Sequence, residues 1–277
     1  MATATTPNVR LSSLPTVAGQ AGLRGALASE FTKLRSVRST YWTLGALFIV
    51  SVGLSVAITA GTAANFANNP GNKAGFDATQ ASLGAFFELG QLIIAVLGAM
   101  VITSEYSTGM MRTSLAALPR RGTVFAAKAI VFTVVALVTG LVTTFASFFV
   151  GQALISGHAP HAALGDPGVA RAVAGGGLYL AALAVLSVAA GALLRRPAAA
   201  IAAMIAVLLV LPGIAQALPD SWRNPVTEFW PTQAGSQVTS VYHSAHTLQP
   251  WPGFGVMCLF VAIVYAIAWT LLDRRDA

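Results

Sequence analysis

Charged residues are scarce in this chain. Only 9% of its 277 residues are Asp, Glu, Lys or Arg, whereas about 25% is usual for a soluble globular protein. So few charges cannot cover a water-exposed surface, and the composition therefore excludes an ordinary soluble domain. Apolar residues make up 56% of the chain and gather in uncharged blocks. Each block is long enough to cross a hydrocarbon core about 30 Å thick, which predicts membrane-spanning helices.

Several chemical groups that an enzyme would need are also missing. Cys258 is the single cysteine, so no intrachain disulfide or thiolate metal cluster can form. The histidines form two pairs at i, i+3 spacing, His158/His161 and His243/His246, but a full set of neighbouring metal ligands is lacking. No segment has the G-x-x-x-x-G-K-[ST] pattern that cradles nucleotide phosphates. We therefore expect no catalytic residues, no metal and no cofactor in this chain, and we expect that it is not an enzyme.

Six apolar blocks predict an all-α membrane protein with six transmembrane helices. The expected spans cover residues 41–60, 83–104, 129–154, 172–194, 198–218 and 251–272, within a transmembrane domain of residues 41–277. Residues 1–20 lack an apolar run, and we expect them to form a flexible tail. The first block is too long for a cleavable signal and is expected to remain as the first span. Pro212 and Gly213 predict a kink or interruption in the fifth span.

The basic residues predict the orientation of the chain. With six spans and a cytoplasmic N-terminus, thirteen of the sixteen Lys and Arg residues fall on the cytoplasmic side; the outer side keeps Lys73, Arg171 and Arg223. This agrees with the excess of Lys and Arg in cytoplasmic loops of membrane proteins. We therefore expect a multi-pass protein of the plasma membrane with both termini in the cytoplasm. Topology accounts for the net charge of +7, so nucleic acid is not needed as a partner.

Residues 21–40, before the first span, have the pattern of an amphipathic helix. Its apolar side chains recur at the spacing of one helix face; they are Leu23, Leu27, Phe31 and Leu34. Lys33 and Arg35 lie at the borders of that face, where their charges could reach lipid phosphates. This pattern predicts a helix lying on the inner leaflet. The alternative is a basic tether that only sets topology.

The inner connection between spans two and three is also patterned. Met111, Leu115 and Leu118 recur at i, i+4 and i+7, which predicts a short helix with an apolar face. Pro119 would end this helix, and Gly109 allows a sharp turn between it and the second span. Such a face must rest on the inner leaflet or on another protein. The alternative is an ordinary basic loop.

Three segments of the chain resemble a known family. They are TSEYSTGMMRTSLAALPRRGTVFAAK, ASEFTKLRSVRSTYW and PWPGFGVMCLFVAIVYAIAWTLLDRRD. They resemble the membrane subunit of a type-2 ATP-binding-cassette (ABC) exporter, of the kind common in high-GC Gram-positive bacteria. The resemblance implies six spans, an N-terminal interfacial helix and a coupling helix between spans two and three. It also implies two such subunits, as a homodimer or heterodimer, docked on two cytoplasmic ABC ATPases that bind ATP and Mg.

The resemblance assigns residues to the coupling region by position. These residues are Glu105, Tyr106, Gly109, Arg112, Thr113, Leu115, Pro119, Arg120 and Arg121. Phe229, Pro231 and Gly235 are similar to the outer re-entrant stretch of the family. Trp230 departs from that pattern, because an aliphatic residue is expected there. From its aromatic residues alone, the segment 219–250 is expected to lie partly on or in the outer leaflet.

Glu88 is the single charge in the six predicted spans. A carboxylate inside a span is costly and should face protein or water. With Gln91 it would mark a substrate path or a subunit interface; the alternative is a wet residue at the outer interface.

The sequence therefore favours the permease subunit of an ABC exporter, which forms the substrate pathway and contacts membrane lipids, a second permease subunit and the ATPase. One alternative is a secondary transporter or channel driven by an ion gradient. That class often has internal repeats and intramembrane ionisable relays, and no repeat is evident here. A second alternative is a membrane scaffold that transports nothing.

Overall fold

The computed structural model describes residues 22–68, 77–85, 89–117, 121–157, 159–242 and 246–274. Six of its helices are long and apolar enough to cross a membrane. They cover Arg38–Phe66, Gln91–Thr108, Arg121–Ile155, Val169–Leu194, Pro197–Ala215 and Pro250–Leu272. The predicted all-α fold with six spans is therefore confirmed, and the chain is a multi-pass membrane protein.

Several helices extend beyond the apolar blocks from which they were predicted. Helix α2 covers Arg38–Asn68 and α6 covers Arg121–Ile155, with 31 and 35 residues. At 1.5 Å per residue these helices are about 46 and 52 Å long, well beyond a hydrocarbon core of about 30 Å. The hydropathy of the sequence identifies only the part of each helix that contacts lipid tails. As a result, Lys128, which the sequence placed at the end of a loop, lies two turns inside α6.

Helix α7 (Val169–Leu194) forms the centre of the bundle. It is the most buried span, and it packs against α4 (Gln91–Thr108), α6 and α12 (Pro250–Arg274). Glycines allow the close approach: a Cβ on Gly177 would lie 2.6 Å from Leu141, and one on Gly191 would lie 2.9 Å from the carbonyl oxygen of Ala99. Small residues at such crossings are typical of membrane helix packing.

The second predicted span includes parts of two described helices. They are α3 (Ala78–Ala85) and the long helix α4 (Gln91–Thr108), and residues 86–88 lie outside the described residues. Side chains from neighbouring helices donate to the carbonyl groups of α3: Thr59 Oγ1 to Ala81 (3.1 Å) and Gln152 Nε2 to Ala78 (2.9 Å). These bonds from α2 and α6 hold α3 against the bundle and stabilise its position. Tertiary hydrogen bonds of this kind leave no mark in local hydropathy.

The fifth span is interrupted, as Pro212 and Gly213 predicted. It consists of α8 (Pro197–Ile205), a π-helical segment (Ala206–Val210) and α9 (Leu211–Ala215). In the π-helical segment Leu211 N–H donates to Ala206 O. The next donor in this register would come from Pro212, which has no N–H. Trp230 Nε1 donates to the Val207 carbonyl instead, at 2.9 Å.

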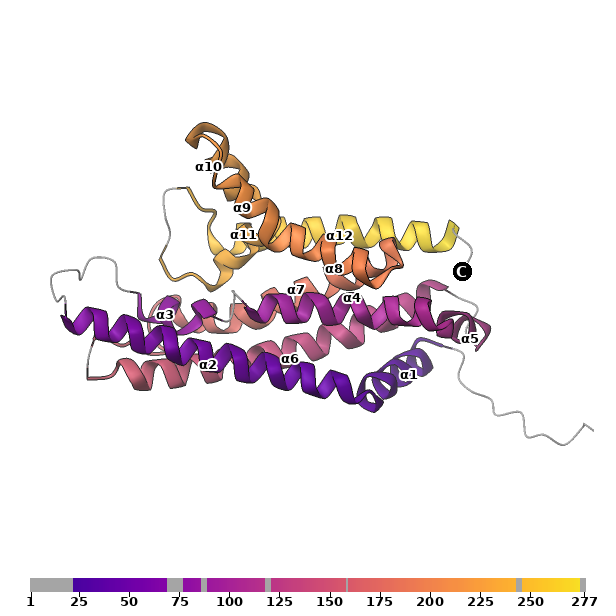
Figure 1. Cartoon of the computed structure of the whole chain (residues 1–277), viewed down its shortest axis with the longest axis horizontal. Coiled ribbons are helices and arrows are strands. Elements are labelled where there is room, and N and C mark those ends of the chain that lie inside the picture. Colours follow the sequence, from indigo (N-terminus) through magenta and orange to yellow (C-terminus); the bar gives the residue numbers. More distant parts are fainter. Residues whose placement is uncertain are drawn as a thin grey trace, which may run out of the picture.

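The segment after the fifth span contains two helices and one 3₁₀ turn: α10 (Asp220–Phe229), α11 (Pro231–Ser236) and Gln237–Thr239. Helix α10 projects from the bundle, while α11 packs against α12 (Figure 1). Gly235 and Gly253 allow this packing, because a Cβ at either position would overlap Met257 or the Ala234 carbonyl. The indole bond explains why Trp230 stands where an aliphatic residue was expected: it supplies the donor that Pro212 lacks.

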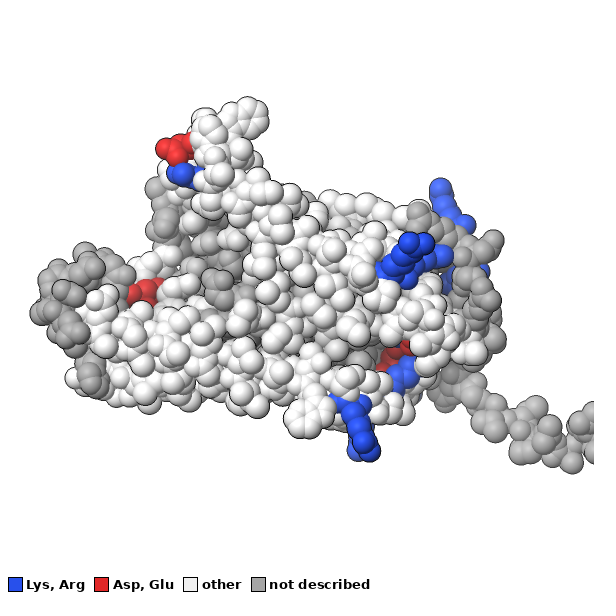
Figure 2. Space-filling model, viewed as in Figure 1, with Lys and Arg blue, Asp and Glu red and all other residues white. Residues whose placement is uncertain are grey.

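Charged residues are segregated along the bundle (Figure 2). Helix α1 (Leu23–Ser36), helix α5 (Met110–Ala117) and the C-terminal end of α12 lie at the same end (Figure 1). We call this the basic end, because most Lys and Arg residues among those described lie there, and a wide uncharged belt separates it from the opposite end. Segregation of this kind is what the positive-inside pattern predicts.

Candidate functional site

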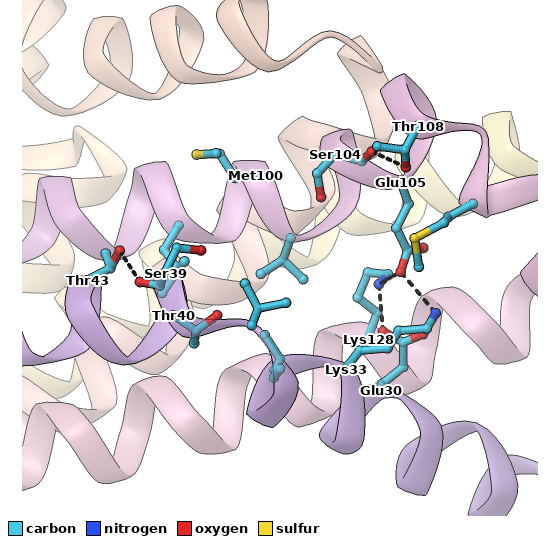
Figure 3. Close-up of a pocket in the computed structure, with 15 residues that line it drawn as sticks. Glu30, Lys33, Ser39, Thr40, Thr43, Met100, Ser104, Glu105, Thr108 and Lys128 are labelled. Atoms are coloured by element: carbon cyan, nitrogen blue, oxygen red, sulfur yellow. Dashed lines mark hydrogen bonds and ion pairs between the residues drawn. The ribbon is translucent and has the colours of Figure 1, made fainter.

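Four charged side chains meet at the basic end, and we call them the charge cluster: Glu30 on α1, Lys33 on α1, Glu105 on α4 and Lys128 on α6. Lys128 Nζ lies 2.6 Å from Glu30 Oε2 and 2.9 Å from Glu105 Oε1. Lys33 Nζ lies 2.7 Å from Glu30 Oε1 and 3.0 Å from Glu105 Oε1. Each lysine therefore contacts both carboxylates, and the cluster joins α1, α4 and α6 (Figure 3).

The cluster is largely shielded from water. Glu30, Glu105 and Lys128 are buried, and only Lys33 is partly exposed. Its two positive and two negative charges balance, so no net charge is buried. Burial acts to lower the pKa of Lys33, but the hydrogen bonds from its ammonium to Glu30 and Glu105 outweigh this effect and raise the pKa above its usual 10.5. Lys33 is therefore protonated throughout the physiological range.

Lys33 also bridges the joint between α4 and α5. Gly109 forms this joint in the left-handed conformation, with φ at +73°, which favours glycine because it has no Cβ. On one side of the joint Lys33 Nζ contacts Glu105, and on the other side it donates to Ser114 Oγ at 3.2 Å. Movement of α5 relative to α4 would therefore disturb the charge cluster.

Two further contacts connect this region with the rest of the basic end. The Arg195 guanidinium lies over the Tyr106 ring, 5.2 Å from its centroid, and forms a cation–π contact. Arg195 is the residue after α7, in the two-residue turn to α8. Arg121 Nη1 donates to the Leu272 carbonyl of α12 at 3.4 Å. Residues near α5 are thus connected to α12 and to the turn between α7 and α8.

A cavity of about 340 Å³ opens beside the charge cluster. The cluster and the hydroxyl groups of Ser39, Thr40, Thr43, Ser104 and Thr108 form its polar part, and the apolar residues are Leu34, Val37, Leu97, Met100, Val101 and Met110. Helices α1, α2 and α4 contribute most of these residues (Figure 3). The space is therefore charged at the cluster, carries hydroxyl groups from α2 away from it (Figure 3), and has an apolar wall between them.

The structure places the residues predicted for the interfacial helix on α1. Leu23 and Phe31 are exposed, Leu27 and Leu34 are half-buried, and Arg35 is exposed. The expectation for Lys33 was wrong: its ammonium does not extend toward lipid phosphates but turns into the bundle. Two buried carboxylates attract it there. The buried side of α1 consists of Ala26 and Glu30, so part of the predicted lipid-facing helix packs against this chain itself.

The residues predicted for the coupling region are only partly described. Glu105, Tyr106, Gly109 and Arg121 have the contacts given above. Met111 is 5% exposed and packs in the hydrophobic core of this chain, whereas Met110 is exposed. Thr113 is exposed too. Leu118, Pro119 and Arg120 lie outside the described residues, and the side chains of Arg112 and Leu115 are not described. Met110 lines the cavity, so the outward surface of α5 is represented by Thr113.

Glu88 and Gln91 were predicted to mark a substrate path or a subunit interface, and the structure describes only Gln91. Glu88 lies outside the described residues. Gln91 begins α4, and its Oε1 accepts a hydrogen bond from Tyr179 OH of α7 at 2.7 Å. Tyr179 is 1% exposed. This bond fixes the beginning of α4 to the central helix, which is a structural role for Gln91.

Sequence reasoning missed Glu30 and Lys128. The i, i+3 spacing of Glu30 and Lys33 could have indicated their ion pair on a helix. Lys128 gave a weaker signal, because it stands among apolar residues that the longer α6 includes. The convergence of all four charges could not be read from the sequence, since Glu30 and Lys128 are 98 residues apart.

These features together define a class: a six-span helical membrane protein with a buried, charge-balanced cluster at its basic end. Residues 26–213 match the family model described as ABC-2 family transporter protein. The match covers about two thirds of the chain, from α1 to α9, and the chain therefore belongs to the ABC-2 transporter family. It is the membrane subunit of an ABC transporter. No curated protein matches the chain in sequence.

Proposed function

We propose that this chain is the permease subunit of an ABC exporter in the plasma membrane, driven by a separate cytoplasmic ATPase that contacts α5. The ATP and Mg are bound by the ATPase, and a second permease subunit completes the transporter. The basic end faces the cytoplasm, because thirteen of the sixteen basic residues belong to that side when the N-terminus is cytoplasmic.

The observation that carries this proposal is the position of Lys33 across the Gly109 joint. Its ammonium contacts Glu105 on α4 and Ser114 on α5, and through Glu30 it is connected to Lys128 on α6. A partner that displaces α5 therefore moves a group that three other helices share. Rigid-body displacement of packed helices is a common means of switching between two states. In the proposed mechanism, ATP closes the partner pair, α5 moves, and the spans rearrange to open a pathway outward.

The outward side of α5 is available for contact with the ATPase. Thr113 is exposed and does not line the cavity. A docking surface needs accessible side chains. The buried Met111 packs the same helix against the core of this chain, so displacement of α5 would also act on that core.

Affinity purification of the tagged chain from its native membrane tests the proposal. We expect an ATP-hydrolysing protein to co-elute with the wild type and to be lost from a Thr113→Asp variant, because Thr113 is exposed on α5 and does not line the cavity. Trp222→Asp is the matched control, because Trp222 is an exposed apolar residue, 68% accessible, on α10 outside the basic end. Co-elution of the ATPase with both variants would place its docking site elsewhere. Absence of any ATPase from the wild-type eluate would contradict the proposed function.

A further inference from the structure

The cavity beside the charge cluster has a feature that the cluster itself does not explain. Both lysines contact the same oxygen of Glu105, Oε1. The other oxygen, Oε2, is buried and has no hydrogen-bond partner among the described residues. Glu105 is 5% exposed and lines the cavity. An acceptor left without a donor in this way destabilises a folded protein, and a ligand that supplies the donor would relieve that cost.

The lining of the cavity indicates what kind of molecule fits. Lys33, Glu105 and the hydroxyl group of Ser104 lie at its charged part, while Leu97 and Met100 of α4 contribute to the apolar wall. Three hydroxyl groups of α2 also line the cavity, those of Ser39, Thr40 and Thr43. A volume of about 340 Å³ lies at the lower end of the range for small-molecule sites, about 300–1,000 Å³. The occupant therefore has a polar head and an apolar body, which is the chemistry of an amphiphile.

The position of the cavity agrees with this chemistry. It lies between α1, at the basic end, and the spans α2 and α4, which continue into the uncharged belt (Figures 2 and 3). A lipid presents its polar head and the beginning of its acyl chain at the same boundary between charged and uncharged surface. The amphiphile would reach this site from the bilayer without crossing water.

The charges around Glu105 decide which head group is favoured. The cluster is charge-balanced, and two ammonium groups lie within 3.0 Å of the Glu105 carboxylate. A cationic head would gain no net attraction and would be repelled by both lysines at close range. An uncharged hydroxyl donates a hydrogen bond to a carboxylate without that repulsion.

We propose that this cavity binds an amphiphile whose uncharged head group carries a hydroxyl, such as the glycerol or sugar head of a lipid. The hydroxyl donates to Glu105 Oε2, and the apolar body lies against Leu97, Met100 and Val101. The site is formed by this chain alone and does not depend on the proposed ATPase.

Equilibrium binding of three radiolabelled probes to the purified full-length chain in detergent tests this proposal. The probes are 1-decanoylglycerol, methyl decanoate and decylammonium, which share the length of their apolar chain and differ in head group. We expect 1-decanoylglycerol to bind at least tenfold more tightly than methyl decanoate, because only the former donates a hydrogen bond. We also expect it to bind more tightly than decylammonium. Equal affinities for 1-decanoylglycerol and methyl decanoate would overturn the proposal, and so would tighter binding of decylammonium than of 1-decanoylglycerol.

Two variants test the location without altering the charge cluster. Met100→Trp fills the apolar part of the cavity and should weaken binding of 1-decanoylglycerol by at least tenfold. Val134→Trp is the matched control: Val134 is 53% exposed on α6 and does not line the cavity, so affinity should stay within twofold of wild type. Partition of the probe into detergent is the same for both variants. Equal affinities of the two variants would show that the probe binds elsewhere and would overturn the proposal.

Discussion

Replacement of Lys128 by methionine removes one of the two cations from the charge cluster. Lys128 is 2% exposed, and its ammonium lies within 2.9 Å of both carboxylates. In Lys128→Met, Glu30 and Glu105 share Lys33 alone, and one buried negative charge lacks a counterion. Leaving a buried charge uncompensated costs about 3–5 kcal/mol. We therefore expect the free energy of unfolding to fall by about that amount.

A double-mutant cycle separates the ion-pair interaction from a general effect of the substitution. Glu30→Gln alone leaves two lysines with one carboxylate, and we expect a loss of similar size. The double variant Glu30→Gln/Lys128→Met removes one charge of each sign, so Lys33 and Glu105 remain as a balanced pair. Its loss should be smaller than the sum of the two single losses, because residues in one network are not additive.

Unfolding in mixed detergent micelles, followed by circular dichroism, measures these free energies. Arg35→Met is the control, since Arg35 lies on the same helix as Glu30 but is exposed; its effect should stay within about 0.5 kcal/mol. The reasoning would be refuted if both cluster variants lost less than about 1 kcal/mol and their effects were additive.

Three further predictions concern single positions. Gly109→Ala should lower the free energy of unfolding by about 1–2 kcal/mol, because the joint has φ at +73°. Gly45 lies inside helix α2 with open space at its Cβ position, and Gly45→Ala should not lower it, because alanine favours a helix; equal losses would contradict this. Trp230→Phe removes the donor to the Val207 carbonyl and should cost about 1–3 kcal/mol in the same measurement; a neutral effect would show that the carbonyl finds another donor. The pKa of Lys33 is raised above 10.5, so the stabilisation of the fold by protonated Lys33 is complete below pH 10.5 and is lost as the pH rises through the raised pKa. In an alkaline titration the wild type should therefore lose more free energy of unfolding than Lys33→Met. Equal losses with pH in the two proteins would argue against the pairing.

The number of spans was readable from the sequence because each span must satisfy a simple physical requirement. A helix that crosses lipid needs about 20 apolar residues, and this signal lies within each segment. The π-helical interruption of the fifth span also had a local cause, the missing N–H of Pro212. By contrast, the position of α3 depends on donors from Thr59 and Gln152, which belong to other helices.

The charge cluster was beyond sequence reasoning for a related reason. Glu105 was assigned to the coupling region by resemblance, and Lys33 was assigned to the lipid surface by amphipathic spacing. Periodicity shows that Lys33 lies at the border of an apolar face, but it cannot show whether lipid phosphates or buried carboxylates lie beside that border. The answer depends on the packing of α1 against α6, which brings Glu30 to Lys128.

Site-specific cross-linking from α5 tests the central claim most directly. The chain has one cysteine, so a Cys258→Ser background allows a single thiol to be placed at Thr113, which is exposed on α5. A photoactivatable cross-linker on Thr113→Cys should couple the chain to a protein that also binds an ATP analogue, and the yield should change when ATP is added. The same reagent on Trp222→Cys should not capture that protein. Capture of no ATP-binding protein from Thr113→Cys in native membranes would contradict the account.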